Sequence, residues 1–203
     1  MNKEILLKHI AETAYNVGFG AKKHFATFDL IDQAPRIIGF LSMAAAIFAL
    51  VFEPLSTEAV SATFIVFGVV ALHIGAYESD KRKYSEAGVK LTQLLNRLKR
   101  LYMLVQATED KKTDEYVEKL HTIETEYYDS SISRQILFSD WFAHYKFFWQ
   151  QQISWIEREI KFRLFRDKIP LSFTVTVLLL LMFAVAWICD FAIPSCCPWG
   201  KAA

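Results

Sequence analysis

The chain has 203 residues, of which 53% are hydrophobic and 22% charged, and its mean hydropathy is +0.21. This composition is too apolar for an ordinary soluble domain of the same size and favours a membrane protein. The 23 basic residues nearly balance the 22 acidic ones, so the chain lacks the overall basic excess that marks a nucleic-acid-binding protein.

In chain order, the sequence predicts an all-α membrane protein. Residues 1–35 form an amphipathic N-terminal helix, and residues 36–78 form a transmembrane helical hairpin with spans at 36–53 and 59–77. A third apolar stretch at 169–193 predicts an additional transmembrane helix, followed by a tail at 194–203. Lengths near 20 residues suit a hydrocarbon layer of about 30 Å. A buried hairpin in a soluble bundle is the alternative, but too little chain remains to cover three such runs.

The distribution of basic residues sets the predicted topology. The hairpin turn at 53–58 contains no Lys or Arg, whereas basic residues flank the other ends of all three runs. The positive-inside rule therefore places the N-terminus in the cytoplasm and the C-terminus outside.

Residues 79–168 are predicted to form a cytoplasmic helical and coiled-coil bundle. A heptad seam comprises Ala87, Leu91, Leu94, Leu98, Leu101 and Val105. No proline lies between Ser61 and Gln106, which predicts one unbroken helix from the membrane into the bundle. An aromatic helix over 132–167 is expected to pack one face, from Phe138 to Leu164, on the Leu91 seam. Its second stripe, with Trp141, Phe148 and Trp155, is more than one packing partner needs and is expected to face another subunit.

Motifs for catalysis or metal binding are weak, and we expect no catalytic residues, no metal, no cofactor and no enzymatic activity. Gly18 and Gly20 form only part of a phosphate-loop pattern, because the Walker spacing is missing. Glu118 and His121 have the spacing of a di-iron bundle motif, yet only a single copy occurs. Cys196 and Cys197 lie together in the predicted tail, where they either form a disulfide between subunits or have no role.

Polar and small residues inside the predicted spans are candidates for a pore lining or for contacts between helices. They are His73, Ser42, Gly39, Gly68 and Gly75. An imidazole is costly in hydrocarbon, so His73 is expected to face a conducting path or to bond a neighbouring helix. Small residues allow close approach between helix backbones.

Three segments resemble a known family. The stretch from Ala14 to Asp29, the Gly39-Phe40 start of a short-looped hairpin, and the basic Lys81–Lys83 helix are similar to the SLATT family of bacterial two-transmembrane effector domains. The additional C-terminal span departs from the two-helix plan. The resemblance implies an oligomeric inner-membrane effector of a bacterial anti-phage conflict system, which forms a gated pore or disrupts the membrane when triggered, leading to abortive infection. It carries over no catalytic residues.

The implied partners are membrane lipids, further copies of the chain, and a nucleotide second messenger or a cognate sensor protein; nucleic acid is not expected. Two interpretations stand for the basic residues near the inner membrane face: they bind an anionic ligand, or they contact lipid headgroups. These residues are Lys22, Lys23, His24, Arg36, Lys81, Arg82 and Lys83. The alternative function is a non-conducting membrane scaffold that recruits a cytoplasmic sensor or enzyme.

Overall fold

The computed structural model describes residues 2–52, 57–108 and 113–192, and every regular element in them is a helix. The all-helical prediction is therefore confirmed for these residues. The chain divides into two compact units, Met1–Lys161 and Phe162–Ala203, which we describe separately.

The first unit is organised around α1 (Lys3–Ala49), a single helix of 47 residues. The side chain of Asn2 caps it by accepting a hydrogen bond of 3.2 Å from the Glu4 backbone N–H. Its buried positions lie between Leu6 and Ile31, at the spacing of one helix face, and none follows Ile31. The helix continues through Pro35, so the predicted N-terminal helix and first span are two halves of one element.

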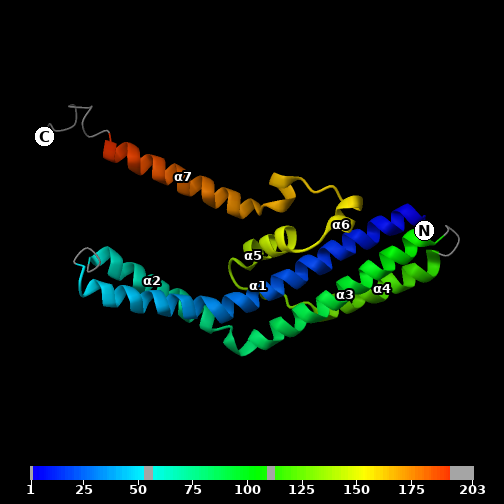
Figure 1. Cartoon of the computed structure of the whole chain (residues 1–203), viewed down its shortest axis with the longest axis horizontal. Helices are drawn as coiled ribbons and strands as arrows, with labels where there is room; N and C mark the ends of the chain where they lie inside the picture. The colour runs from blue at the N-terminus through cyan, green and yellow to red at the C-terminus, as the bar shows by residue number, and fades with distance from the viewer. Residues whose placement is uncertain (1, 53–56, 109–112, 193–203) are drawn as a thin grey trace. The chain divides into compact units, whose positions relative to one another are not determined.

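The second half of α1 and α2 (Glu58–Gly75) form the apolar hairpin, side by side in Figure 1. Large apolar side chains such as Phe40, Ile47 and Ile65 are more than half exposed. Exposure on this scale is unfavourable in water and suits lipid. Both α1 and the helical stretch that begins at Glu58 are long and apolar enough to cross a membrane, which agrees with the two predicted hairpin spans.

The predicted unbroken helix from Ser61 to Gln106 is wrong at one place. Helix α2 ends at Gly75, and a single 3₁₀ turn, η2 (Glu78–Asp80), leads into α3 (Lys81–Ala107). Tyr77, directly before this turn, is buried in a cluster with Ile31, Tyr84 and Ile136.

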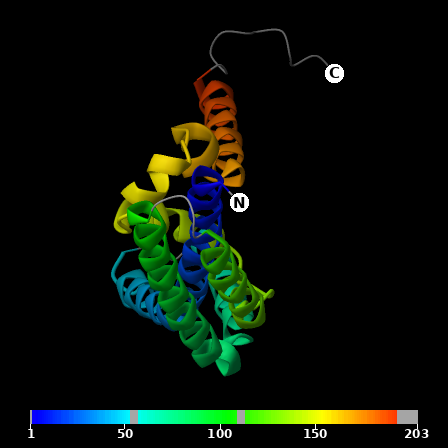
Figure 2. The ribbon, with the colours of Figure 1, turned by 90° about the vertical axis from the view of Figure 1, so that its right-hand side faces the viewer.

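Helices α1, α3 and α4 (Thr113–Ser130) form the bundle, with α3 antiparallel to the first half of α1. Lys3 Nζ donates to the carbonyl oxygens of Gln106 (3.0 Å) and Thr108 (2.7 Å), so the start of α1 is fixed to the end of α3. All six residues of the heptad seam are buried. In Figure 2, α1 lies between α3, α4 and the segment that follows α4.

The single aromatic helix predicted over 132–167 is wrong. The structure has an extended linker at 131–136, then α5 (Ser139–Tyr145), η4 (Lys146–Gln150) and α6 (Ser154–Glu159), with η5 (Leu164–Lys168) in the second unit. Phe138 has a φ of 68°, which is unusual for a bulky residue and stops the helix at its start.

The predicted division into two aromatic stripes is wrong as well, because the breaks redistribute the side chains. Phe138, Tyr145 and Trp149 of the first stripe are exposed, whereas Trp155 of the second is buried and contacts Tyr102 of α3, with 5.2 Å between ring centroids. The main partner of the Leu91 seam is α1, not the aromatic segment. Two apolar stripes cannot both face the bundle from one straight helix, and the short helices solve this by turning the buried side chains inward.

The second unit contains η5 and α7 (Leu171–Ala192), an apolar helix of 22 residues. At 1.5 Å per residue its length is about 33 Å. Leu171–Ala186 is an apolar helical stretch, and the transmembrane role of α7 stays a prediction. The predicted tail with Cys196 and Cys197 lies outside the described residues.

Candidate functional site

The candidate site is the junction where the apolar hairpin meets the bundle. It consists of residues 24–36 of α1, residues 74–84 at the α2–α3 turn, and the linker at 131–136. Ile31, Ile74, Tyr77, Tyr84 and Ile136 form its buried core, with Phe28, Leu30, Ala34 and Ile132 packed against them. The junction thus joins both helices of the hairpin to a linker that is distant in sequence.

His24 holds the linker against α1. Its side chain is 3% exposed, and Nδ1 lies 2.7 Å from the Gly20 carbonyl oxygen while Nε2 accepts a hydrogen bond of 3.0 Å from the Ile132 N–H. The carbonyl requires a donor at Nδ1 and the amide requires an acceptor at Nε2, so the ring is the neutral tautomer protonated on Nδ1. Burial lowers the pKa of the His24 imidazole, and the positive charge of Lys23 lowers it further.

Further hydrogen bonds position the linker from both sides. Thr27 Oγ1 donates to Gln135 Oε1 at 2.6 Å, and the Gln135 amide donates to the Ile132 carbonyl at 2.7 Å. Tyr84 Oη donates to the Arg134 carbonyl at 2.7 Å. The Arg134 guanidinium lies over the Tyr77 ring, 4.3 Å from its centroid. The linker therefore contacts α1, the α2–α3 turn and α3 at once.

Ion pairs surround this polar and aromatic cluster. Asp32 pairs with Arg36 across Pro35 and with Lys81 at 2.5 Å, so one carboxylate connects α1 to the start of α3. The hydrogen bond from Lys81 lowers the pKa of Asp32, and the same bond raises the pKa of Lys81. Lys83 pairs with Asp80 at 2.7 Å.

The structure does not gather the predicted basic residues into one open site. Arg36, Lys81 and Lys83 have the carboxylate partners given above, Lys23 pairs with Asp140 at 2.7 Å, and Arg82 pairs with Glu86 at 3.2 Å. His24 is buried with both ring nitrogens bonded. Lys22 is half-buried, and burial together with the nearby charge of Lys146 lowers its pKa. An anion would have to displace existing partners at most of these positions.

The hairpin candidates lie on surfaces that this chain leaves uncovered. His73 is exposed on α2, and its ring contacts Tyr77 with 5.9 Å between centroids. A Cβ added at Gly39, Gly68 or Gly75 would meet nothing within 4 Å, so these glycines do not serve a close contact within the chain. Ser42 is partly exposed. That these residues line a pore or contact another copy stays a prediction.

The weak motifs have packing and surface roles. A Cβ at Gly18 would lie 2.8 Å from Phe147 Cε2, so this glycine makes room for a buried ring instead of a phosphate. Glu118 and His121 are exposed on α4, whereas Glu124 accepts a hydrogen bond of 2.8 Å from Thr13. Within the described residues, no group of three or more His, Cys, Asp or Glu side chains is placed to hold a metal ion.

Sequence reasoning missed the linker residues of the junction. Thr27, Arg134 and Gln135 carry no motif, and they meet only because the chain returns to α1 more than 100 residues later. One signal was present: Ser131 and Ser133 flank Ile132 in a polar break directly after α4, which is typical of a loop.

The fold and this site define a class: an all-helical protein with a two-helix apolar hairpin fixed to a helical bundle. The comparison with protein families identifies which family of this class the chain belongs to. The family model SLATT_6, described as SMODS and SLOG-associating 2TM effector domain 6, matches residues 1–177, and the chain belongs to this family. The resemblance seen in the sequence is thereby confirmed. No curated protein and no solved structure matches the chain.

Proposed function

We propose that the protein is an oligomeric inner-membrane effector of a bacterial anti-phage conflict system, in which the hairpin forms a gated pore or disrupts the membrane when triggered. Its family is one of two-transmembrane effector domains. The observation that supports gating most directly is the junction, because the same linker contacts α1, the α2–α3 turn and α3. A rearrangement of the bundle therefore acts on both helices of the hairpin.

Assembly of several copies is part of this proposal. Gly39, Gly68 and Gly75 face open space in the single chain, and glycines in spans favour close packing between helices. A hairpin of two helices is too small to enclose a pore alone, so conduction requires further copies. His73, exposed near the end of α2, is the polar side chain that we place at the path or at a contact between copies.

In this proposal, contacts at the junction favour the closed state until a trigger acts. Tyr84 is 1% exposed, and its hydroxyl bonds the Arg134 carbonyl. Loss of one such bond costs about 1 kcal/mol, which corresponds to about a fivefold change in an equilibrium between closed and open states. A variant that lacks only this hydroxyl should therefore conduct more readily.

Membrane potential tests the proposal. Bacteria induced to express the chain, alone and with its genomic neighbours under phage challenge, are measured with a potential-sensitive dye. We expect the wild type to depolarise the membrane on challenge, and Tyr84→Phe to depolarise it with a weaker trigger or with none. Tyr128→Phe is the matched control, because the Tyr128 side chain is 72% exposed on α4 and lies outside the buried core of the junction.

The second candidate is a non-conducting scaffold that recruits a cytoplasmic sensor or enzyme. It is favoured by the bundle, which offers exposed surfaces of α3 and α4 for a partner protein. A normal potential in every strain, with membrane insertion and expression verified, would contradict the pore and favour the scaffold. Equal depolarisation by Tyr84→Phe and Tyr128→Phe would support conduction but contradict the proposal that the junction controls it.

A further inference from the structure

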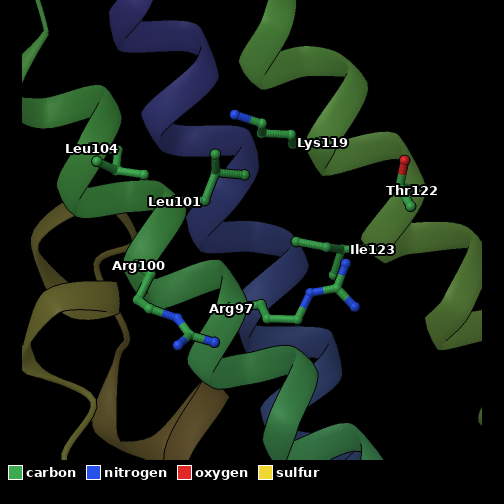
Figure 3. A pocket seen from close by; sticks show the side chains of 7 residues that line it. All are labelled: Arg97, Arg100, Leu101, Leu104, Lys119, Thr122 and Ile123. Carbon is green, nitrogen blue, oxygen red and sulfur yellow. The ribbon is translucent and has the colours of Figure 1, made fainter.

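A groove between α3 and α4 lies apart from the junction. Its volume is about 430 Å³, within the range of small-molecule sites. The lining residues are Arg97, Arg100, Leu101 and Leu104 of α3 and Lys119, Thr122 and Ile123 of α4 (Figure 3). Two helices thus contribute to one open site within the bundle.

The groove combines an apolar floor with cations. Leu101 and Ile123 are buried, and Leu104 is 52% exposed. Figure 3 shows the Lys119 side chain extending from α4 toward α3, and the Arg97 side chain extending from α3 toward Ile123. Basic side chains of both helices therefore lie next to an apolar surface. This arrangement suits a ligand that combines an anionic group with an apolar body.

Two of the three groove cations have exposed carboxylate partners that a ligand would have to displace. The Glu126 carboxylate accepts hydrogen bonds from Nη1 of Arg97, at 2.8 and 2.6 Å, and Lys119 pairs with Glu115 at 2.6 Å. Both pairs are more than one-third exposed, and exposed pairs contribute about 0–1 kcal/mol, so a stronger anion can replace them. Arg100 has no ion-pair partner in the part of the chain that the structure describes.

Lipid headgroups do not account for this cluster. Arg97 lies sixteen residues beyond Lys81, where α3 leaves the hairpin. At 1.5 Å per residue this is about 24 Å along the helix. The end of α3 is fixed to Lys3, at the end of α1 farthest from the hairpin. The groove therefore belongs to the distal part of the bundle, where the positive-inside rule does not operate.

We propose that the groove binds a small phosphate-bearing molecule with an apolar body. The planar guanidinium groups of Arg97 and Arg100 offer paired donors to phosphate oxygens, and Lys119 adds a mobile charge. The Thr122 hydroxyl lines the same space, and Leu101, Leu104 and Ile123 take the apolar body. This binding site stands whether or not the hairpin conducts.

Such chemistry has two sources, a mononucleotide or a single-chain alkyl phosphate, and calorimetry separates them. The full chain in nanodiscs is titrated with adenosine monophosphate and, separately, with octyl phosphate; titrations of empty nanodiscs are subtracted. We expect saturable binding of at least one probe. The double variant Arg100→Gln/Lys119→Gln should weaken it at least tenfold. Lys90→Gln, which removes an exposed charge of α3 outside the groove, should leave it within twofold of wild type.

The floor is tested with Leu104→Asn, since this side chain is half exposed and its replacement spares the core. Leu104→Asn should lower the affinity for the probe severalfold. Inorganic phosphate has no apolar body, so it should compete equally well in the variant and in the wild type. Circular dichroism checks that each variant keeps its helical content. The proposal is wrong if neither probe gives saturable heat with the wild type, or if the double variant binds as tightly as Lys90→Gln.

Discussion

The sharpest test of the junction is its dependence on pH through His24. In the folded protein the ring is neutral, donates from Nδ1 to Gly20 and accepts at Nε2 from the Ile132 N–H. Protonation would turn Nε2 into a donor facing that N–H, so the bond to the linker would be lost. The Tyr84 ring, Gln135 and Lys23 are the other polar or charged neighbours, and none of them is an anion.

The sign and size of the effect follow from linkage. The pKa of His24 in the fold is below the ordinary value of 6.5 that the unfolded chain retains. Its contribution to stability is therefore complete above pH 6.5 and is lost as the pH falls from there toward the folded pKa. A single proton taken up on unfolding changes the free energy of unfolding by at most about 1.4 kcal/mol per pH unit.

Thermal unfolding in nanodiscs between pH 8 and pH 5 measures this. His24→Gln keeps an oxygen that can accept from Ile132 but does not titrate, so its melting temperature should fall less than that of the wild type below pH 6.5. His121→Gln removes an exposed histidine of α4 and should retain the wild-type slope. Parallel slopes for His24→Gln and the wild type would refute the assignment of a neutral, buried ring at this position.

Two further predictions concern packing in the bundle. Gly18→Ala should lower the melting temperature, because the clash with Phe147 costs about 1–3 kcal/mol and the gain in helix propensity is only about 1 kcal/mol. Gly20→Ala is the matched control. Its Cβ would meet its nearest neighbour at 3.5 Å, so this substitution should raise the melting temperature. Burial and the 2.7 Å bond to Glu159 raise the pKa of Tyr102 to about 12. Tyr102→Phe should therefore destabilise the fold by about 1–2 kcal/mol in denaturant unfolding and remove a step near pH 12 from a spectrophotometric tyrosine titration; an unchanged midpoint would contradict this contact.

The elements that sequence reasoning predicted correctly depend on local patterns. The hairpin follows from the length of its apolar runs, and the buried side of α3 follows from the spacing of Leu91, Leu94 and Leu98. Periodicity failed over 132–167, because an aromatic-rich segment fits a helix pattern whether or not the helix is continuous. The left-handed backbone at Phe138 interrupts this segment, and no local spacing of apolar residues records it.

The site was predictable only in part for the same reason. Basic residues near the hairpin were recognised, but their carboxylate partners were not. Asp32 meets Lys81 only after the hairpin returns the chain, and Asp140 meets Lys23 only after the linker does. Charge patterns in a sequence show where cations gather, whereas the fold decides which of them are already neutralised.

The two hairpin helices are connected to the bundle in different ways, and this difference bears on how a signal would travel. Helix α1 passes from bundle to hairpin without a break, although Pro35 withholds the N–H that would bond the Ile31 carbonyl. Helix α2 ends before a 3₁₀ turn. Asp32 contacts both places, through Arg36 across Pro35 and through Lys81 after the turn. One carboxylate thus bridges the Pro35 turn of α1 and the start of α3, so its loss would remove both ion pairs together, whereas loss of either cation would remove only one.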